Sequence, residues 1–137
     1  MKSLFVVLAL LMATSLYAQN AEEETATVYF MRSTGVQGSI SKVNAFIDGE
    51  LVCKLNNYQY STHQVTPGKR EFVEQRSGKK LQETARTIEI DVQPGETYYI
   101  TAILETDFFV NQVYCQEVTQ NSALTVLPRL QADEKCL

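Results

Sequence analysis

The chain has 137 residues, with 12 basic and 16 acidic side chains and a formal net charge of −4. This length fits a single domain and leaves little room for two independent cores. The acidic balance argues against a nucleic-acid partner, because binding of phosphates depends on clustered Lys and Arg. Basic side chains do gather between residues 69 and 80, but Glu71 and Glu74 are interleaved with them. We therefore expect a solvated hairpin there.

The first 18 residues have the features of a secretory signal peptide. Lys2 precedes an unbroken apolar run from Leu4 to Met12, and small residues follow up to Ala18. The apolar run is too short to cross a bilayer comfortably, and no second run follows, so no membrane span is expected after cleavage. Gln19 follows the predicted cut, so the cysteine that carries the lipid of lipoproteins is missing. We expect a periplasmic or extracellular protein that is soluble after cleavage.

The predicted domain starts after a short acidic leader. Residues 19–25 have nothing to bury, which predicts disorder. Residues 26–32 are rich in β-branched and aromatic side chains with apolar groups on both faces, and they predict a strand covered on both sides. The polar connection at 33–42 is a candidate functional rim, because binding residues concentrate on loops.

Asp48-Gly49 separates two apolar segments, 43–47 and 51–55, and predicts a β-hairpin. Both turn residues tolerate the positive φ that a tight turn demands. A two-residue loop pairs Ile47 with Glu50 and sets the register of the remaining positions. A bulged three-residue loop would change this pairing. With the two-residue loop, we expect one face of the hairpin to point into the core, and this face consists of Asn44, Phe46, Leu51, Cys53 and Leu55.

Turns at Thr66-Pro67-Gly68 and Pro94-Gly95 divide the rest of the chain into short extended segments. One or two helical turns are expected after Ser122, and Pro128 prevents a long helix. We expect residues 131–137 to form a loosely held tail. The further predicted strands lie at 58–65, 69–75, 87–92, 97–105 and 112–118.

About seven or eight short strands, spaced by turn signals and without a sustained helical period, predict an all-β domain over residues 26–130. The expected architecture is an antiparallel β-sandwich with a short C-terminal helical turn. A small β-barrel is the alternative.

Four short motifs in this order give the chain a family resemblance: Ala26-Thr27-Val28-Tyr29-Phe30, Phe46-Ile47-Asp48-Gly49, Thr66-Pro67-Gly68-Lys69 and Pro94-Gly95-Glu96-Thr97-Tyr98-Tyr99-Ile100. With these motifs the chain resembles the bacterial domain of unknown function 2846 family. The resemblance covers most of the chain after the signal peptide and implies a small β-rich envelope domain. It supplies no catalytic motif. Many relatives are lipoproteins, and the missing lipid-site cysteine departs from them.

The three cysteines, Cys53, Cys115 and Cys136, leave at least one thiol unpaired. Cys53 and Cys115 each lie in a predicted strand, so they are the candidate disulfide, which would contribute about 4 kcal/mol. Cys136, next to the C-terminus, is expected to be mobile, which would leave a reactive thiol or a site for pairing with another chain. Three buried or frayed free thiols are the alternative to any bridge.

His63 is the only histidine, and a catalytic role would require a Ser or Cys nucleophile and an acid from elsewhere in the fold. No nucleophile elbow is present, and neither are His-x-His, Cys-x-x-Cys or calcium-loop spacings. We therefore predict no catalytic, metal or cofactor site. A hydrolase or other enzyme that uses His63 remains the alternative function.

Two aromatic pairs, Tyr98-Tyr99 and Phe108-Phe109, would each place one ring away from a single core if the backbone is extended. The outer rings either pack under a loop or the C-terminal turn, or form a contact patch. Such a patch would suit an envelope protein, a peptide or a glycan. The sequence thus predicts an exported, non-enzymatic envelope protein that serves as a binding or structural module.

Overall fold

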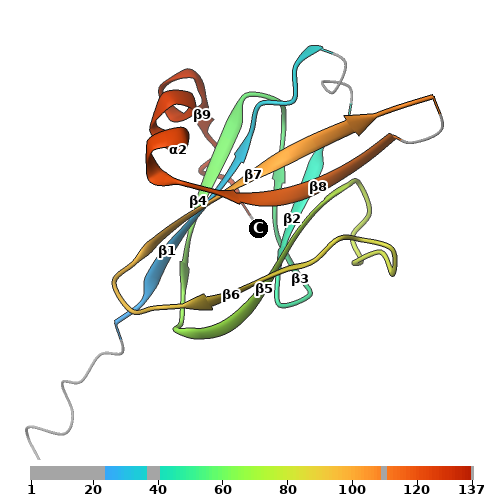
Figure 1. Cartoon of the computed structure of the whole chain (residues 1–137). Coiled ribbons are helices and arrows are strands. Elements are labelled where there is room, and N and C mark those ends of the chain that lie inside the picture. Colours follow the sequence, from blue (N-terminus) through green and yellow to red (C-terminus); the bar gives the residue numbers. More distant parts are fainter. Residues whose placement is uncertain (1–23, 37–40, 109–110, 137) are drawn as a thin grey trace, which may run out of the picture.

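The computed structural model describes residues 24–36, 41–108 and 111–136. The predicted signal peptide and most of the predicted leader lie outside these residues. Within the described part, nine strands form two sheets that pack face to face, and a short helix covers one of them (Figure 1). The predicted β-sandwich is confirmed, and the strands do not close into the alternative barrel.

The first sheet has the strand order β8-β7-β1-β4-β9. The middle strand β1 runs antiparallel to β4 but parallel to β7, and β9 is also parallel to its neighbour β4. The sheet is therefore mixed, whereas the sequence predicted antiparallel pairing. Its strands are β1 (Ala26–Arg32), β4 (Gln59–Val65), β7 (Thr97–Thr106), β8 (Asn111–Val118) and β9 (Gln131–Ala132).

The second sheet is fully antiparallel, with the order β3-β2-β5-β6. The predicted hairpin at Asp48-Gly49 joins β2 to β3, and both turn residues have positive φ, at 50° and 81°. The turn therefore forms for the reason that the sequence suggests. The strands of this sheet are β2 (Val43–Ile47), β3 (Glu50–Leu55), β5 (Gly68–Arg76) and β6 (Ile88–Val92).

A bulge in β3 changes which side chains of the hairpin face the core. Phe46 pairs with Leu51, but Ala45 pairs with Cys53, so Val52 is an extra residue in the ladder. Ala45 and Cys53 join the main core cluster, whereas Phe46 is buried on the opposite face. The expected core face, with Phe46 and Cys53 together, is therefore wrong, because the bulge reverses the alternation of β3 relative to β2.

The segment after β5 folds back over the outer face of the second sheet. Gln75, only 2% exposed, donates from Nε2 to the carbonyl oxygens of Ser77 and Lys80, at 3.1 and 2.8 Å. Its Oε1 accepts from the backbone N–H of Gln82 at 2.9 Å. One buried amide therefore holds the polar tip that follows β5.

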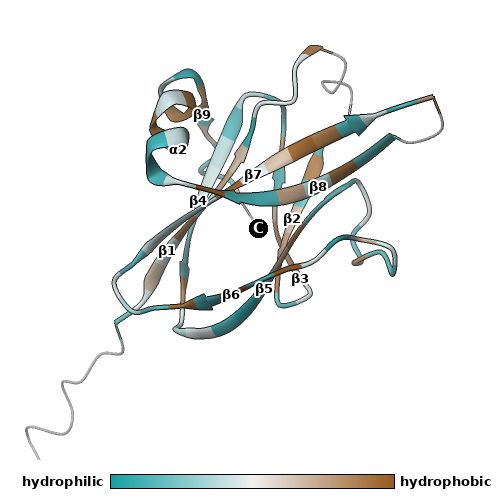
Figure 2. Ribbon diagram, in the orientation of Figure 1, coloured by the Kyte–Doolittle hydropathy of each residue, from teal (hydrophilic) through white to brown (hydrophobic). Residues whose placement is uncertain are grey.

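The main core fills the space between the two sheets, where hydrophobic residues concentrate in the strands (Figure 2). Phe30 of β1 meets Phe72 of β5 edge to face, with ring centroids 6.1 Å apart. The buried members of the cluster come from both sheets: Ala26, Val28, Phe30, Ala45, Cys53, Leu55, Val65, Phe72, Ile90, Val92, Ile100 and Cys115.

A second, smaller cluster forms on the outer face of the first sheet, under α2 (Gln120–Val126) and the 3₁₀ turn η2 (Leu127–Arg129). Thr119 caps α2, because its Oγ1 accepts a hydrogen bond from the Ser122 N–H at 3.3 Å. Ala123 and Leu130 pack there against Met31 and Tyr99. The predicted C-terminal helical turn is thus present, and it gives the first sheet a cover on its outer face.

One carboxyl group lies inside the main core. Glu74 of β5 is fully buried, and neither of its carboxyl oxygens has a hydrogen-bond partner among the described residues. Burial raises the pKa of Glu74 well above its usual value, and the positive charge of Arg32 opposes this shift only in part. We therefore expect this carboxyl group to hold its proton in the folded protein at neutral pH.

The raised pKa predicts that Glu74 lowers stability as the pH rises. The unfolded chain loses this proton near pH 4.5, while the folded protein keeps it. The contribution of Glu74 to the free energy of unfolding is therefore most favourable below that pH. It is lost progressively as the pH rises towards the folded-state pKa. Glu74→Gln should remove this loss, so its free energy of unfolding should exceed that of the wild type by about 1–3 kcal/mol at pH 8. Urea unfolding at pH 4 and pH 8 measures both proteins, and an equal difference at the two pH values would contradict the assignment.

Candidate functional site

The β3/β4 side of the sandwich, where β3 of the second sheet lies next to β4 of the first, holds two of the three cysteines and the histidine of the described chain. β3 is the last strand of its sheet, and only the two residues of β9 lie beyond β4. The groups that meet on this side are two sulfur atoms, an imidazole, a hydroxyl and a carboxylate, from Cys53, Cys136, His63, Ser61 and Asp133.

A disulfide joins Cys53 of β3 to Cys136, with their Cα atoms 4.6 Å apart at a sequence separation of 83. The chain before Cys136 is held on β4, because the Gln131 N–H donates to the Tyr58 carbonyl oxygen at 2.9 Å and the Asp133 N–H to that of Tyr60 at 2.8 Å. The C-terminal segment, which the sequence predicted to be loose, is therefore fixed at β4 and again at β3.

The predicted disulfide between Cys53 and Cys115 is wrong. Cys115 lies on β8, at the other edge of the first sheet, where its Sγ is 3.5 Å from the carbonyl oxygen of Phe72 on β5. Cys53 is two strands away from β5 in the second sheet. Burial raises the pKa of the Cys115 thiol to about 12, so this thiol is protonated and unreactive in the folded protein.

His63 lies on the inner face of β4, half-buried, with its ring edge to face against Phe30 at a centroid distance of 5.6 Å. Its Nε2 is 2.9 Å from the Oγ of Ser61, two residues earlier on the same face of the strand. Burial lowers the pKa of His63, because the charged imidazolium is poorly solvated there. The imidazole is therefore neutral at physiological pH.

The distance between Ser61 and His63 is that of a nucleophile and a general base, but the Ser61 hydroxyl is buried and cannot be reached by a substrate. Ser61 is only 2% exposed, and it lines neither of the two hollows on this side of the molecule. An attacking oxygen must come within bonding reach of a substrate atom. The geometry of this pair therefore favours a structural hydrogen bond over nucleophilic attack.

Two hollows flank the disulfide on the β3/β4 side. The first, of about 600 Å³, lies between the β2-β3 hairpin and β4, and its lining combines apolar and polar groups: Ile47, Asp48, Glu50, Val52, Thr62, His63, Gln64, Val65, Thr66 and Arg70. The second, of about 570 Å³, lies beside the C-terminal segment. Its lining is mostly polar and includes three lysines among eight residues, which are Lys42, Lys54, Asn56, Gln59, Ala132, Asp133, Glu134 and Lys135.

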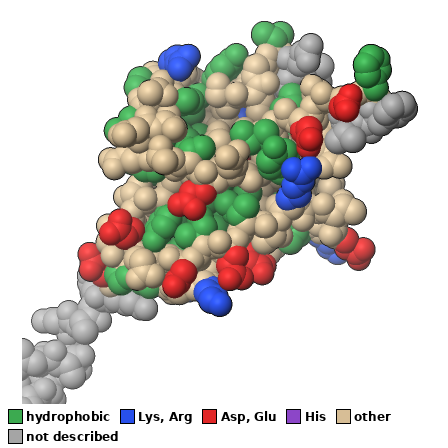
Figure 3. Space-filling view, viewed as in Figure 1, with side chains coloured by type: hydrophobic (Ala, Val, Ile, Leu, Met, Phe, Trp, Pro, Cys, Tyr) green, Lys and Arg blue, Asp and Glu red, His purple; other side chains and the backbone are tan. Residues whose placement is uncertain are grey.

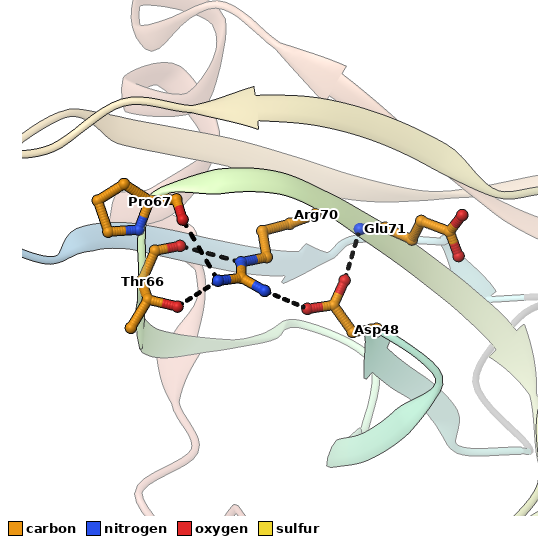
Figure 4. A network of polar contacts seen from close by, with 5 residues as sticks. All are labelled: Asp48, Thr66, Pro67, Arg70 and Glu71. Carbon is orange, nitrogen blue, oxygen red and sulfur yellow. Dashed lines mark hydrogen bonds and ion pairs between the residues drawn. The ribbon is translucent and has the colours of Figure 1, made fainter.

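The charged residues that line the first hollow, Asp48 and Arg70, hydrogen-bond to each other and to neighbouring residues (Figure 4). Arg70 donates to Asp48 Oδ2 at 3.1 Å, to the Thr66 carbonyl oxygen at 3.0 Å and to the Thr66 hydroxyl. The other carboxylate oxygen of Asp48 accepts from the Glu71 N–H at 2.9 Å. This network joins the β2-β3 turn to the turn before β5. Arg70 and Asp48 therefore have a structural role in the fold.

The predicted aromatic contact patch does not form from the two tyrosines. Tyr98 packs partly buried against the main core, and its hydroxyl accepts from the Gln93 N–H at 2.8 Å. Tyr99 points to the other face of β7, where it is 9% exposed and stacks on Tyr29 at 5.2 Å beneath α2. Each ring is covered because the sandwich has a second cluster on its outer face.

Phe108 remains exposed, at 98%, in the loop between β7 and β8, and its predicted partner Phe109 lies outside the described residues. On the face drawn in Figure 3, hydrophobic side chains form several separate areas rather than one continuous patch. Sequence reasoning missed Asp133 and the pairing of Cys136 with Cys53, because neither residue belongs to a recognised ligand spacing.

A family profile described as "Protein of unknown function (DUF2846)" matches residues 22–117. The chain belongs to the DUF2846 family. The matched region contains Cys53, Ser61 and His63, whereas Asp133 and Cys136 lie beyond its end. No curated protein and no solved structure matched the chain significantly. In the described part of the chain, no helix has the length and apolar character needed to cross a membrane.

The disulfide should stabilise this DUF2846 protein strongly, because it closes a loop that spans 83 residues. The double variant Cys53→Ser/Cys136→Ser should lose about 4–5 kcal/mol of unfolding free energy by the loop-entropy relation. Denaturant unfolding with and without a reductant measures the loss. Reduction should destabilise the wild type and leave the double variant unchanged, and a double variant that still responds to reductant would place the disulfide elsewhere.

Proposed function

We propose that this DUF2846 protein is an exported, non-catalytic binding module, and that the free edge of β4 takes up an extended peptide segment of an envelope protein. The observation that carries the proposal is an unpaired strand edge beside a hollow on the β3/β4 side. Three features support it, namely the backbone geometry of β4, the lining of the first hollow and the disulfide.

The backbone geometry of β4 defines which groups are free. The N–H groups of Gln131 and Asp133 donate to the carbonyl oxygens of Tyr58 and Tyr60, so the even-numbered residues of β4 direct their backbone N–H and C=O groups away from β1. Thr62 and Gln64 are the next such positions, and β9 does not reach them. Among the described residues, no strand pairs with this stretch. An unpaired edge is a template for an added strand.

The first hollow gives an added strand a place for its side chains. Ile47, Val52 and Val65 contribute apolar surface, and Thr62 lies at its border with the free edge. Side chains of a strand alternate between its two faces, so every second residue of a bound peptide would point towards this hollow. Main-chain hydrogen bonds would then supply affinity, and the hollow would supply selectivity.

The disulfide supports an exported setting, because disulfides persist in oxidising compartments and are rare in the cytosol. This agrees with the signal peptide that the sequence predicts. The burial of Ser61 supports a role without catalysis, since the hydroxyl next to the only histidine has no route to a substrate. The proposal therefore favours binding over the alternative of a hydrolase.

Site-specific cross-linking tests the proposed edge in cells that produce the full chain. A photoreactive phenylalanine derivative at the exposed Thr62 should capture a partner, and the same group at the exposed Glu89 of β6 serves as the matched control. The captured segment, made as a synthetic peptide, should bind the purified protein. Capture at both positions alike, or a partner segment that does not bind as a free peptide, would contradict the proposal.

Thr62→Pro provides the second arm of this test. It removes the outward N–H of Thr62 without breaking the ladder to β1, because proline is tolerated on a free strand edge. We expect peptide affinity to fall at least about 10-fold, while the thermal unfolding midpoint stays within a few degrees of the wild type. Unchanged affinity in this variant would show that the peptide does not add to β4.

A further inference from the structure

Three side chains of the types that bind zinc meet beside β4, and one of them comes from the C-terminal segment. One ligand atom each from Cys53, His63 and Cys136 lies within 4.8 Å of the other two. Two thiolates and an imidazole are a donor set typical of Zn²⁺, which binds four ligands as a tetrahedron. We propose that reduction of the Cys53–Cys136 disulfide converts this place into a zinc site, with Asp133 as the fourth ligand. This inference does not depend on peptide binding at the edge of β4.

The chemistry balances with a dithiol as reductant. The disulfide takes up two electrons and two protons from the dithiol, which itself becomes a disulfide, and two Cys thiols result. Each thiol releases its proton as its sulfur binds the metal. Zn–S bonds of about 2.3 Å in a tetrahedron place the two sulfur atoms about 3.8 Å apart. Two Cα atoms 4.6 Å apart permit this separation.

The two cysteines differ in a way that suits such a conversion. Cys53 is fully buried and fixed in the ladder between β2 and β3. Cys136 lies four residues beyond the end of β9, in the terminal segment, so it can adjust its position once the covalent bond is gone. Cys53 would therefore be a rigid ligand, and Cys136 would move to bind the metal.

His63 is held in the form that a metal requires. Its ring packs on Phe30, and Ser61 Oγ lies 2.9 Å from its Nε2, which leaves the other ring nitrogen for zinc. Histidines that bind metals use such a hydrogen bond at the second nitrogen to fix the ring.

Asp133 brings a carboxylate close to Cys53, which is the reason for proposing it as the fourth ligand. Its Oδ2 lies 4.0 Å from Cys53 Sγ, and its backbone N–H is bonded to β4 through the Tyr60 carbonyl oxygen. Its other oxygen, Oδ1, accepts from the Lys135 N–H at 2.9 Å and orients the turn towards Cys136.

Metal titration of the full mature chain tests the proposal. The protein is reduced with a phosphine, separated from it without oxygen, and titrated with Zn²⁺ in competition with a chromophoric chelator. We expect one equivalent of zinc to bind reduced protein and none to bind oxidised protein. His63→Ala and Cys136→Ser should each weaken binding at least about 10-fold, and Cys115→Ala should bind as the wild type does.

Cys136→Ser also controls for folding, because it lacks the disulfide just as the reduced wild type does and differs from it by one thiol. Co²⁺ provides a second readout, since a tetrahedral site with two thiolates gives strong visible absorption that His63→Ala should alter. Equal zinc affinity of reduced wild type and Cys136→Ser would overturn the proposal. Loss of the far-UV circular dichroism on reduction, without recovery when zinc is added, would overturn it as well.

Discussion

The covalent link between β3 and the C-terminal segment is the constraint on which the β3/β4 side depends. The segment touches β4 through only two strand residues, and such a short parallel pairing holds little by itself. The bond from Cys136 to Cys53 fixes the position that follows. Because it joins an edge of one sheet to a segment docked on the other, it also fixes how the two sheets meet on this side.

This single link accounts for both features from which function is inferred. To reach Cys53, the chain leaves β4 after Asp133, and β9 therefore ends before it can pair with Thr62 and Gln64. The edge that remains open is a consequence of the route of the chain. The same route brings a carboxylate and a second sulfur next to His63, which contributes only an imidazole from β4.

Turn chemistry made much of the scaffold predictable. Asp48-Gly49 and Pro94-Gly95 form the expected turns, with positive φ at Asp48, Gly49 and Gly95. The strands between such turns follow from their β-branched and aromatic content. Local patterns do not say which strand becomes a neighbour of which. The parallel pairing of β1 with β7 depends on contacts between segments about 70 residues apart in sequence, as Thr27 opposite Thr97 shows.

The candidate site was less predictable for the same reason. The extra residue Val52 reverses one strand relative to its partner, and nothing in the local pattern marks it. Cys136 looked free because it follows the last predicted element, whereas Cys115 looked available because it lies in a strand. Pairing depends on distance in the folded chain, and Cys115 is directed at the carbonyl of Phe72 instead.

The cysteine connectivity of protein recovered from producing cells without reductant tests this account most directly. Cleavage after arginine separates the three cysteines into the peptides 33–70, 87–129 and 130–137. Mass spectrometry should find peptide 33–70 linked to peptide 130–137, and peptide 87–129 alkylated only after denaturation. A link from peptide 87–129 to either of the others, or a link between two chains through peptide 130–137, would contradict the structure of the β3/β4 side.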